Sequence, residues 1–387
     1  MQEGSVEAEQ FNVTVPFENR AGLLFIQVVV NGEEGWFLFD TGAPNLVSEK
    51  FAERLNLETE TKGGVRDSGG NRTKGNSFVL IEDINIGGVH FKNTGAVIQN
   101  LSGSDIFKCL KIDGIIGANL MRQAFWKLDY EEESISLSSN LNDFSIDSTY
   151  EVLPFEVKNT GTPVMNITFG EVTAENMTFD TGSNKEFSLP LNYLREAQGE
   201  NPISTILELG ATSYGVGGKA VSDSIFYAVI DTMHLGSLTI PNSVVAFDAH
   251  SDNFGNAFLK NYDIVLDWES KNIYIKAVTS YENSTLKSHG YGVNLVNGGM
   301  EIGSIFNGSS ADGKLQIGDR VLKIDEYDFS SDAGEMICQL VSSGEMRFKE
   351  REVIEITVER NSQVLSFHLE KLELLTMKQV SKPNRID

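Results

Sequence analysis

An internal repeat constrains the fold of this chain more than any other feature of its sequence. Five landmarks return 138 or 140 residues further along the chain: Pro16-Phe17-Glu18 as Pro154-Phe155-Glu156, Asp40 as Asp180, Ile116-Gly117 as Phe254-Gly255, Leu128-Asp129-Tyr130 as Leu266-Asp267-Trp268, and Ile135 as Ile273. Landmarks that keep one offset within two residues indicate a duplicated structural unit. We therefore predict two similar lobes, over residues 11–137 and 149–276, in one chain.

Each copy has the pattern of a β protein. Residues 24–30 and 36–39 are apolar runs on either side of Asn31-Gly32, a turn sequence typical of a β-hairpin. Further short apolar runs are separated by glycines, of which the chain has 36. Helical patterns are confined to short stretches, such as Ser48 to Leu55 with Ser48 as the N-cap, and Leu191 to Ala197. The predicted fold class is mainly β.

Composition limits the partners of the chain. The net charge of −24 repels nucleic acid and anionic lipid. No run of about 18 apolar residues is present, so we expect no membrane span. Residues 1–5 are polar and acidic and show no secretory signal, although a trimmed leader would leave the same trace. Cys109 and Cys338 lie in different predicted domains, and we expect two unpaired thiols; no His or Cys spacing is typical of a zinc site.

Two aspartates in matched surroundings are the candidate catalytic groups. Asp40 and Asp180 each end an apolar run and are each followed by Thr-Gly, as Thr41-Gly42 and Thr181-Gly182. Two carboxyl groups that share one proton supply a general base, which activates water, and a general acid. The threonine hydroxyls are able to bond to the opposite loop, and the glycines permit a tight backbone turn.

The two copies differ at the next position, which is Ala43 in the first and Ser183 in the second. A serine hydroxyl at this place is able to donate to the neighbouring carboxylate and to favour its charged form. Our hypothesis is that Asp180 ionises more easily and that Asp40 holds the shared proton.

These motifs resemble an aspartic protease of the pepsin and retropepsin clan, which uses Asp-Thr-Gly from two similar lobes. The clan carries two apolar residues and a glycine about 75 residues after each triplet. Ile115-Ile116-Gly117 fits this pattern, whereas Asn253-Phe254-Gly255 has a polar Asn253 that raises a question about the packing of the second loop. The resemblance implies two retropepsin-like lobes that form one bilobal unit, peptide hydrolysis by an activated water, and no metal or organic cofactor.

The same resemblance implies a glycine-rich flap in each lobe, between the aspartate and the later glycine. The candidate residues are Gly69 and Gly70 in the first copy, and Tyr214, Gly217 and Gly218 in the second. A mobile lid of this kind excludes water and completes the site. The alternative is that both segments are ordinary surface hairpins.

Residues 288–372 resemble a PDZ domain, on the run Gly318-Asp319-Arg320-Val321-Leu322. The resemblance implies a groove that binds a peptide by β-augmentation. Its residues would be Gly290, Tyr291, Gly292 and Val293, which present backbone N–H groups to a chain-terminal carboxylate, and Met336 and Leu340 on a helix that opens with the capping box Asp332 and Glu335. The alternative is that the groove holds the protein's own tail or packs on the lobes.

We therefore expect an aspartic endopeptidase whose PDZ-like domain tethers a peptide or protein substrate, or the C-terminus of a partner. The competing hypothesis is a non-catalytic peptide-binding protein on an acid-protease scaffold. Pairing of each lobe with another chain is unnecessary, because both copies lie in one chain. The combination of domains and the acidic composition suggest a bacterial, extracytoplasmic setting, either periplasmic or secreted.

Overall fold

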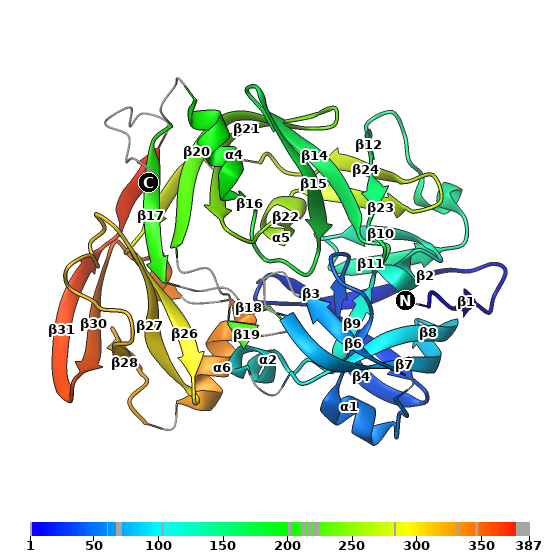
Figure 1. The fold of residues 1–387 in the computed structure, drawn as a ribbon, viewed down its shortest axis with the longest axis horizontal. Helices are drawn as coiled ribbons and strands as arrows, with labels where there is room; N and C mark the ends of the chain where they lie inside the picture. Colours follow the sequence, from blue (N-terminus) through cyan, green and yellow to red (C-terminus); the bar gives the residue numbers. More distant parts are fainter. Residues whose placement is uncertain are drawn as a thin grey trace.

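The fold is taken from a computed structural model, which describes residues 2–59, 61–66, 72–101, 104–199, 203–210, 214–215, 218–219, 224–281, 284–331, 333–344 and 347–376. The chain is mainly β and contains two six-stranded barrels, as expected for two similar lobes. Figure 1 shows the first lobe in blue and cyan, the second mainly in green, and a C-terminal domain in yellow, orange and red at the left.

Lobe 1 comprises the elements from β2 to β11, and β1 (Ser5–Val6) pairs with its strand β8. Its short helix α1 begins after Ser48, whose side chain accepts a hydrogen bond from the Phe51 N–H as the sequence predicted. The elements are β2 (Asn12–Arg20), β3 (Leu23–Val30), β4 (Glu33–Asp40), β5 (Leu46–Ser48), α1 (Glu49–Arg54), β6 (Thr61–Arg66), β7 (Arg72–Ile86), β8 (Val89–Gln99), α2 (Asp105–Leu110), β9 (Gly114–Gly117), α3 (Ala118–Met121), β10 (Phe125–Asp129) and β11 (Ser134–Ser138).

Lobe 2 comprises the elements from β13 to β24, and a connector with the 3₁₀ helix η1 (Leu141–Phe144) and β12 (Glu151–Pro154) leads into it. Its elements are β13 (Glu156–Val157), β14 (Pro163–Phe169), β15 (Val172–Asp180), β16 (Phe187–Pro190), α4 (Leu191–Gln198), β17 (Thr205–Gly210), β18 (Tyr214–Gly215), β19 (Gly218–Lys219), β20 (Ser224–Leu235), β21 (Leu238–Asp248), β22 (Asn253–Gly255), α5 (Asn256–Leu259), β23 (Tyr262–Asp267) and β24 (Asn272–Ala277).

The two lobes meet in a shared antiparallel sheet. Its strand order is β12-β24-β23-β10-β11-β2, so the last strands of each lobe lie side by side. Trp126 of β10 is opposite Leu266 of β23, and Leu128 is opposite Ile264. All four side chains are fully buried, and one continuous hydrophobic core therefore runs through both lobes.

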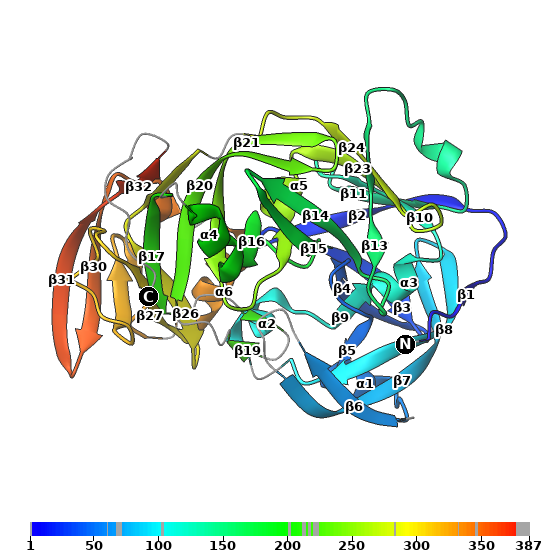
Figure 2. The ribbon, with the colours of Figure 1, turned by 45° about the horizontal axis from the view of Figure 1, so that its top comes forward.

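The C-terminal domain has its own hydrophobic core and extends the sheet of lobe 2. Strand β17 of lobe 2 pairs with β27 of the domain, with Leu209 opposite Ile305, so the sheet crosses the domain boundary (Figure 2). The elements of the domain are β25 (Thr285–Ser288), β26 (Tyr291–Val296), β27 (Gly299–Phe306), β28 (Arg320–Ile324), β29 (Tyr327–Asp328), α6 (Gly334–Ser343), η2 (Arg347–Glu350), β30 (Val353–Arg360), β31 (Gln363–Glu370) and β32 (Leu372–Thr376).

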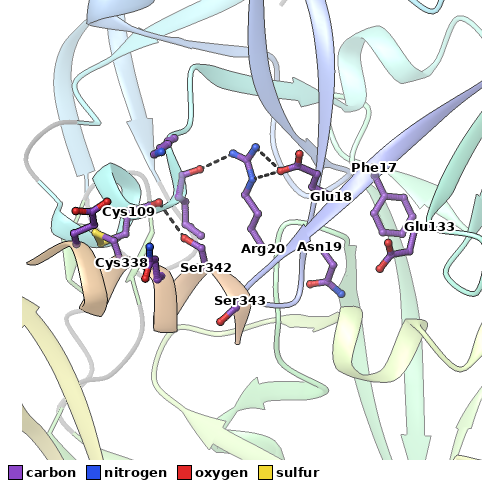
Figure 3. A pocket seen from close by; sticks show the side chains of 13 residues that line it. Phe17, Glu18, Asn19, Arg20, Cys109, Glu133, Cys338, Ser342 and Ser343 are labelled. Atoms are coloured by element: carbon purple, nitrogen blue, oxygen red, sulfur yellow. Dashed lines mark hydrogen bonds and ion pairs between the residues drawn. A yellow bond between two sulfur atoms is a disulfide. The ribbon is translucent and has the colours of Figure 1, made fainter. Parts of the chain in front are cut away.

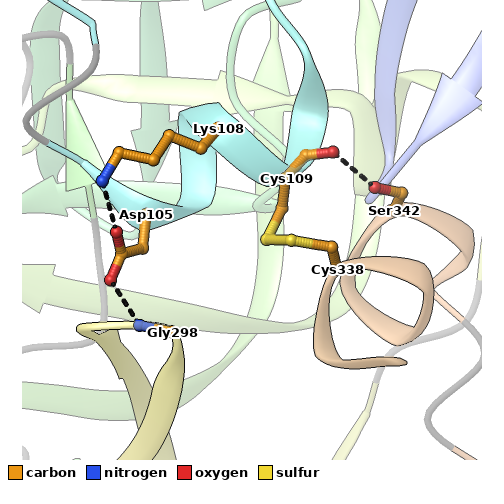
Figure 4. Close-up of a disulfide and its surroundings, with 6 residues drawn as sticks. All are labelled: Asp105, Lys108, Cys109, Gly298, Cys338 and Ser342. Atoms are coloured by element: carbon orange, nitrogen blue, oxygen red, sulfur yellow. Dashed lines mark hydrogen bonds and ion pairs between the residues drawn. A yellow bond between two sulfur atoms is a disulfide. The ribbon is translucent and has the colours of Figure 1, made fainter. Parts of the chain in front are cut away.

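A disulfide joins lobe 1 to the C-terminal domain, so the prediction of two unpaired thiols is wrong. Cys109 of α2 and Cys338 of α6 are bonded, with their Cα atoms 4.6 Å apart (Figure 4). Helix α2 reaches the C-terminal domain because Ile106 and Cys109 pack in that domain's hydrophobic core. Asp105 also accepts a hydrogen bond from the Gly298 N–H, at 3.2 Å.

A cavity of about 600 Å³ lies beside this disulfide, between the end of β2 and helix α6 (Figure 3). Arg20 spans one side of it, where its guanidinium bonds to Glu18 and to the Leu110 carbonyl oxygen. Neither Asp40 nor Asp180 lines this cavity.

In the parts of the chain that the structure describes, no helix has both the length and the apolar composition needed to cross a membrane.

Candidate active site

The two aspartates occupy equivalent positions at the ends of equivalent strands. Asp40 is the last residue of β4 and lies opposite Gly117 of the parallel strand β9. Asp180 is the last residue of β15 and lies opposite Gly255 of the parallel strand β22. Their exposed fractions are 8% and 7%, so both carboxyl groups are largely removed from water.

Reciprocal hydrogen bonds between two threonines hold the aspartate loops together. The Thr41 hydroxyl donates to the Phe179 carbonyl oxygen at 2.6 Å and accepts from the Thr181 N–H at 3.0 Å. The Thr181 hydroxyl donates to the Phe39 carbonyl oxygen at 2.8 Å and accepts from the Thr41 N–H at 3.0 Å. Both threonines are fully buried, and each hydroxyl therefore satisfies two backbone groups of the opposite lobe.

The glycines of the two triplets let each loop approach the opposite carboxyl group. A Cβ atom on Gly42 would lie 2.6 Å from Oδ1 of Asp180. A Cβ atom on Gly182 would lie 2.3 Å from Cγ of Asp40. The N–H groups of these glycines also donate to the aspartate of their own loop, at 2.8 Å for Asp40 and 3.0 Å for Asp180.

Burial raises the pKa of both carboxyl groups. Burial, and next the charge of Asp180, raise the pKa of Asp40 well above its ordinary value, against hydrogen bonds from the Gly42 and Ala43 N–H groups. Burial also raises the pKa of Asp180, to about 6, and hydrogen bonds from Asn253 and Gly182 oppose this increase. Asp180 is therefore the carboxyl group that ionises first as the pH rises.

The source of this inequality is not Ser183, and that part of the hypothesis is wrong. The Ser183 hydroxyl accepts a hydrogen bond from the Lys185 N–H at 3.3 Å instead of donating to Asp180. The side-chain donor is Asn253, whose Nδ2 lies 2.8 Å from Oδ2 of Asp180. The sequence drew attention to Asn253 only as a departure from the expected apolar residue.

Sequence reasoning also missed three asparagines that hold the loops in place through hydrogen bonds to the backbone. Asn256 donates from Nδ2 to the Thr181 carbonyl oxygen at 2.7 Å. In lobe 1, Oδ1 of Asn119 accepts from the Asn45 N–H at 2.7 Å, and Oδ1 of Asn45 accepts from the Gly117 N–H at 2.7 Å. A signal was present in the sequence, since an asparagine follows the later glycine within two residues in both copies.

The candidate flap residues are only partly described. Gly69, Gly70 and Gly217 lie outside the described residues. Tyr214 and Gly218 lie in the short hairpin of β18 and β19, where Gly215 is opposite Gly218. In lobe 1, β6 and β7 form an antiparallel pair on either side of residues 67–71. Hairpins therefore stand at both predicted positions, and their role as lids stays a prediction.

The candidate groove residues lie together in the C-terminal domain. Tyr291, Val293, Met336 and Leu340 pack against one hydrophobic core. The Gly290 N–H is bonded to the Ser288 hydroxyl at 3.0 Å, and Gly292 pairs with Ser304 in the β26–β27 ladder.

Helix α6 begins at Gly334 with Ala333 at its N-cap. Asp332 lies outside the described residues, so the predicted capping box stays a prediction. At 100° per residue, Met336 and Leu340 lie on the flank of α6 opposite Cys338 and Ser342. Cys338 and Ser342 bond to α2, so helix α2 packs on the flank that does not carry the groove candidates.

Across the described ranges, no three or more His, Cys, Asp or Glu side chains are grouped so as to hold a metal ion.

Residues 26–120 match a family model described as aspartyl protease. The match includes Asp40, Thr41, Gly42 and the Ile115-Ile116-Gly117 motif, and it supports an aspartyl-protease domain in this part of the chain. A comparison with curated proteins found no match.

Proposed function

We propose that this chain is an aspartic endopeptidase in which Asp40 and Asp180 together activate a water molecule. The observation that carries the proposal is the pair of buried carboxyl groups on loops that are joined by the Thr41 and Thr181 hydroxyls. Such a pair shares one proton at the working pH, because two adjacent carboxylates ionise together only at a high cost. The aspartyl-protease match over residues 26–120 supports the same reaction class.

In this mechanism the ionised Asp180 accepts a proton from the water molecule, and the water oxygen attacks the peptide carbonyl carbon. The protonated Asp40 donates its proton to the carbonyl oxygen, which gives a tetrahedral diol. The pair then returns one proton to the peptide nitrogen and removes one from a diol hydroxyl as the C–N bond breaks. Because the pKa of Asp180 is about 6, we expect activity to fall below about pH 6 as this carboxylate becomes protonated.

The decisive experiment is cleavage of a denatured protein mixture between pH 3 and pH 8. We expect new peptides from the wild-type chain and none above background from Asp40→Asn or Asp180→Asn. Both variants keep the shape of the side chain, so their melting curves serve as the control for folding. Absence of cleavage by the wild type at every pH would contradict the proposal and favour a non-catalytic peptide-binding protein.

We also propose that the C-terminal domain is PDZ-like and tethers a substrate or partner through Met336 and Leu340. The supporting observation is that these side chains pack against the same hydrophobic core as Tyr291 and Val293. Tethering raises the effective concentration of a bound chain at the active site. Peptides with a free C-terminus should bind more tightly than amidated ones in a fluorescence titration, and equal binding would contradict this role.

An extracytoplasmic location is part of the proposal. The Cys109–Cys338 disulfide supports it, because such bonds persist in oxidising compartments.

A further inference from the structure

Three strand positions beside each aspartate differ completely in polarity between the lobes. The strand registers pair Leu38 with Ile115 and Leu46 with Ile115 in lobe 1, and Thr178 with Asn253 and Ser188 with Asn253 in lobe 2. The lobe 1 set is entirely apolar and packs in one hydrophobic cluster, whereas the lobe 2 set is entirely polar. Because Leu38 and Thr178 precede the aspartates by two residues, each set lies on the same strand face as its aspartate.

The three polar residues of lobe 2 reduce the stability of the folded state. Thr178, Ser188 and Asn253 are all buried. Oδ1 of Asn253 and the Ser188 hydroxyl have no hydrogen-bond partner among the described residues. A buried polar group without a partner destabilises the folded state. Lobe 1 shows that the same strands accept apolar residues at these positions, so packing alone does not account for Asn253.

The contact that Asn253 makes is with the carboxyl group itself. Its Nδ2 donates to Oδ2 of Asp180 at 2.8 Å, while the Gly182 N–H donates to Oδ1 at 3.0 Å. Both carboxylate oxygens of Asp180 therefore accept a hydrogen bond from lobe 2. The residue that corresponds to Asn253 in lobe 1 is Ile115, which has no side-chain donor for Asp40.

The charged groups near Asp180 do not replace this donor. Asp40 faces it from the opposite loop, and the charge of Asp252 disfavours its ionised form. The ammonium of Lys158 bonds to Asp252 at 3.2 Å and to the Thr178 hydroxyl at 3.0 Å. The ammonium of Lys158 is thus directed to Asp252. Among the described residues, two side chains are hydrogen-bonded to Asp180, namely Asn253 and Asp40.

We propose that Asn253 is a positioning residue that keeps Asp180 as the ionised member of the pair, so that the two aspartates have fixed and different roles. A hydrogen bond to a carboxylate favours the charged form, and its presence in one lobe only breaks the symmetry of the duplicated site. This inference rests on the proposed protease function for its kinetic test, but not for its titration test.

The kinetic test compares the pH dependence of kcat/KM for the wild type and Asn253→Leu. Leucine has the same branched arrangement of four side-chain heavy atoms as asparagine but lacks the donor. We expect the acid limb of the profile to move upward by about one pH unit, which is a tenfold loss at a fixed pH below the limb. The matched control is Ser188→Ala, which alters the neighbouring buried position without a bond to Asp180, and its acid limb should not move.

The titration test does not depend on catalysis. Chains labelled with ¹³C at the aspartate carboxyl carbons are titrated by NMR, and the signals of the pair are identified by their change in Asp180→Asn. In Asn253→Leu, the lower apparent pKa of the pair should rise by about one unit. In the exchange variant Ile115→Asn with Asn253→Leu, we expect Asp40 to become the carboxyl group that ionises first.

The outcomes are distinguishable. An inactive wild type whose lower apparent pKa rises in Asn253→Leu would overturn the protease proposal and support the role of Asn253. An active wild type whose apparent pKa values and acid limb stay unchanged, or move downward, in a folded Asn253→Leu would overturn this inference and leave the protease proposal intact. If Asn253→Leu does not fold, Asn253→Ala carries the same expectation.

Discussion

Gly42 and Gly182 bring each loop into contact with the opposite carboxyl group. A methyl group at Gly182 would lie 2.3 Å from Cγ of Asp40, which no packing arrangement tolerates. At the scale of the residue, the geometry of the aspartate pair thus depends on Gly42 and Gly182, which lack side chains, as much as on the two aspartates.

We expect Gly182→Ala to reduce kcat/KM by about a hundredfold or more, because the added methyl group must displace Asp40 by about 1 Å. The control is Gly334→Ala, whose new methyl group would have its nearest neighbour at 3.7 Å, at the first position of helix α6. That variant should keep wild-type activity. Equal activity of Gly182→Ala and the wild type would contradict the close approach of the loops.

Because the pKa of Asp40 is raised in the folded chain, we expect the free energy of unfolding to decrease as the pH rises. In the unfolded chain this group ionises near its ordinary pKa of 3.8, whereas the folded chain retains the proton to a much higher pH. Stability from this group is therefore fully present below pH 3.8 and is lost as the pH rises toward the folded pKa.

Asp40→Asn should consequently have a higher Tm than the wild type at pH 8, and the difference should shrink toward pH 4, as measured by calorimetry. Asp147 provides a control of opposite sign, since hydrogen bonds from Thr149 lower its pKa. Asp147→Asn should be slightly less stable than the wild type at pH 8. A Tm difference for Asp40→Asn that does not change with pH would argue against a raised pKa.

At the scale of the elements, the strand ends of β4 and β15 are joined by the threonine hydroxyls. Thr41→Val keeps the shape of the side chain but leaves the Thr181 N–H and the Phe179 carbonyl without their partner. Two buried groups at about 1–3 kcal/mol each predict a loss of roughly 2–6 kcal/mol in the free energy of unfolding.

The measurement is denaturant unfolding, with Thr41→Ser as the control because serine retains the hydroxyl. We expect Thr41→Ser to lie close to the wild type in stability and activity, and Thr41→Val to lose both. Similar losses in the two variants would show that the methyl group, and not the crossing hydrogen bond, holds the loops.

At the scale of the whole molecule, the disulfide closes a loop between residues 229 apart and ties the C-terminal domain to lobe 1. A disulfide typically contributes about 2–4 kcal/mol. We expect reduction of the wild type, or Cys338→Ser, to increase hydrogen exchange at α2 and α6. Reductant should add nothing further in Cys338→Ser, and an equal effect of reductant on that variant would point to a cause other than this bond.

Local patterns predicted the strands and the aspartate pair well. Apolar runs on either side of the Asn31-Gly32 turn predicted β3 and β4, and the repeat made Asp180 the counterpart of Asp40. The disulfide and the role of Asn253 were not predictable in the same way. Both depend on which surfaces meet in three dimensions: α2 on the C-terminal domain, and β22 beside Asp180. In the sequence, Asn253 is only a polar residue in an apolar motif, whereas the structure shows its hydrogen bond to Asp180.

The pairing of β17 with β27 has a consequence for where this chain can be divided. Strand β17 carries the exposed side chain of Leu209, and without the C-terminal domain the edge that β27 covers would have no partner. Bare strand edges promote association between molecules. A chain that ends at Ala277 should therefore form concentration-dependent oligomers in analytical ultracentrifugation, and Leu209→Lys should restore the monomer. We therefore expect the two lobes to need the C-terminal domain to stay monomeric, even though the sequence resembles two separable proteins.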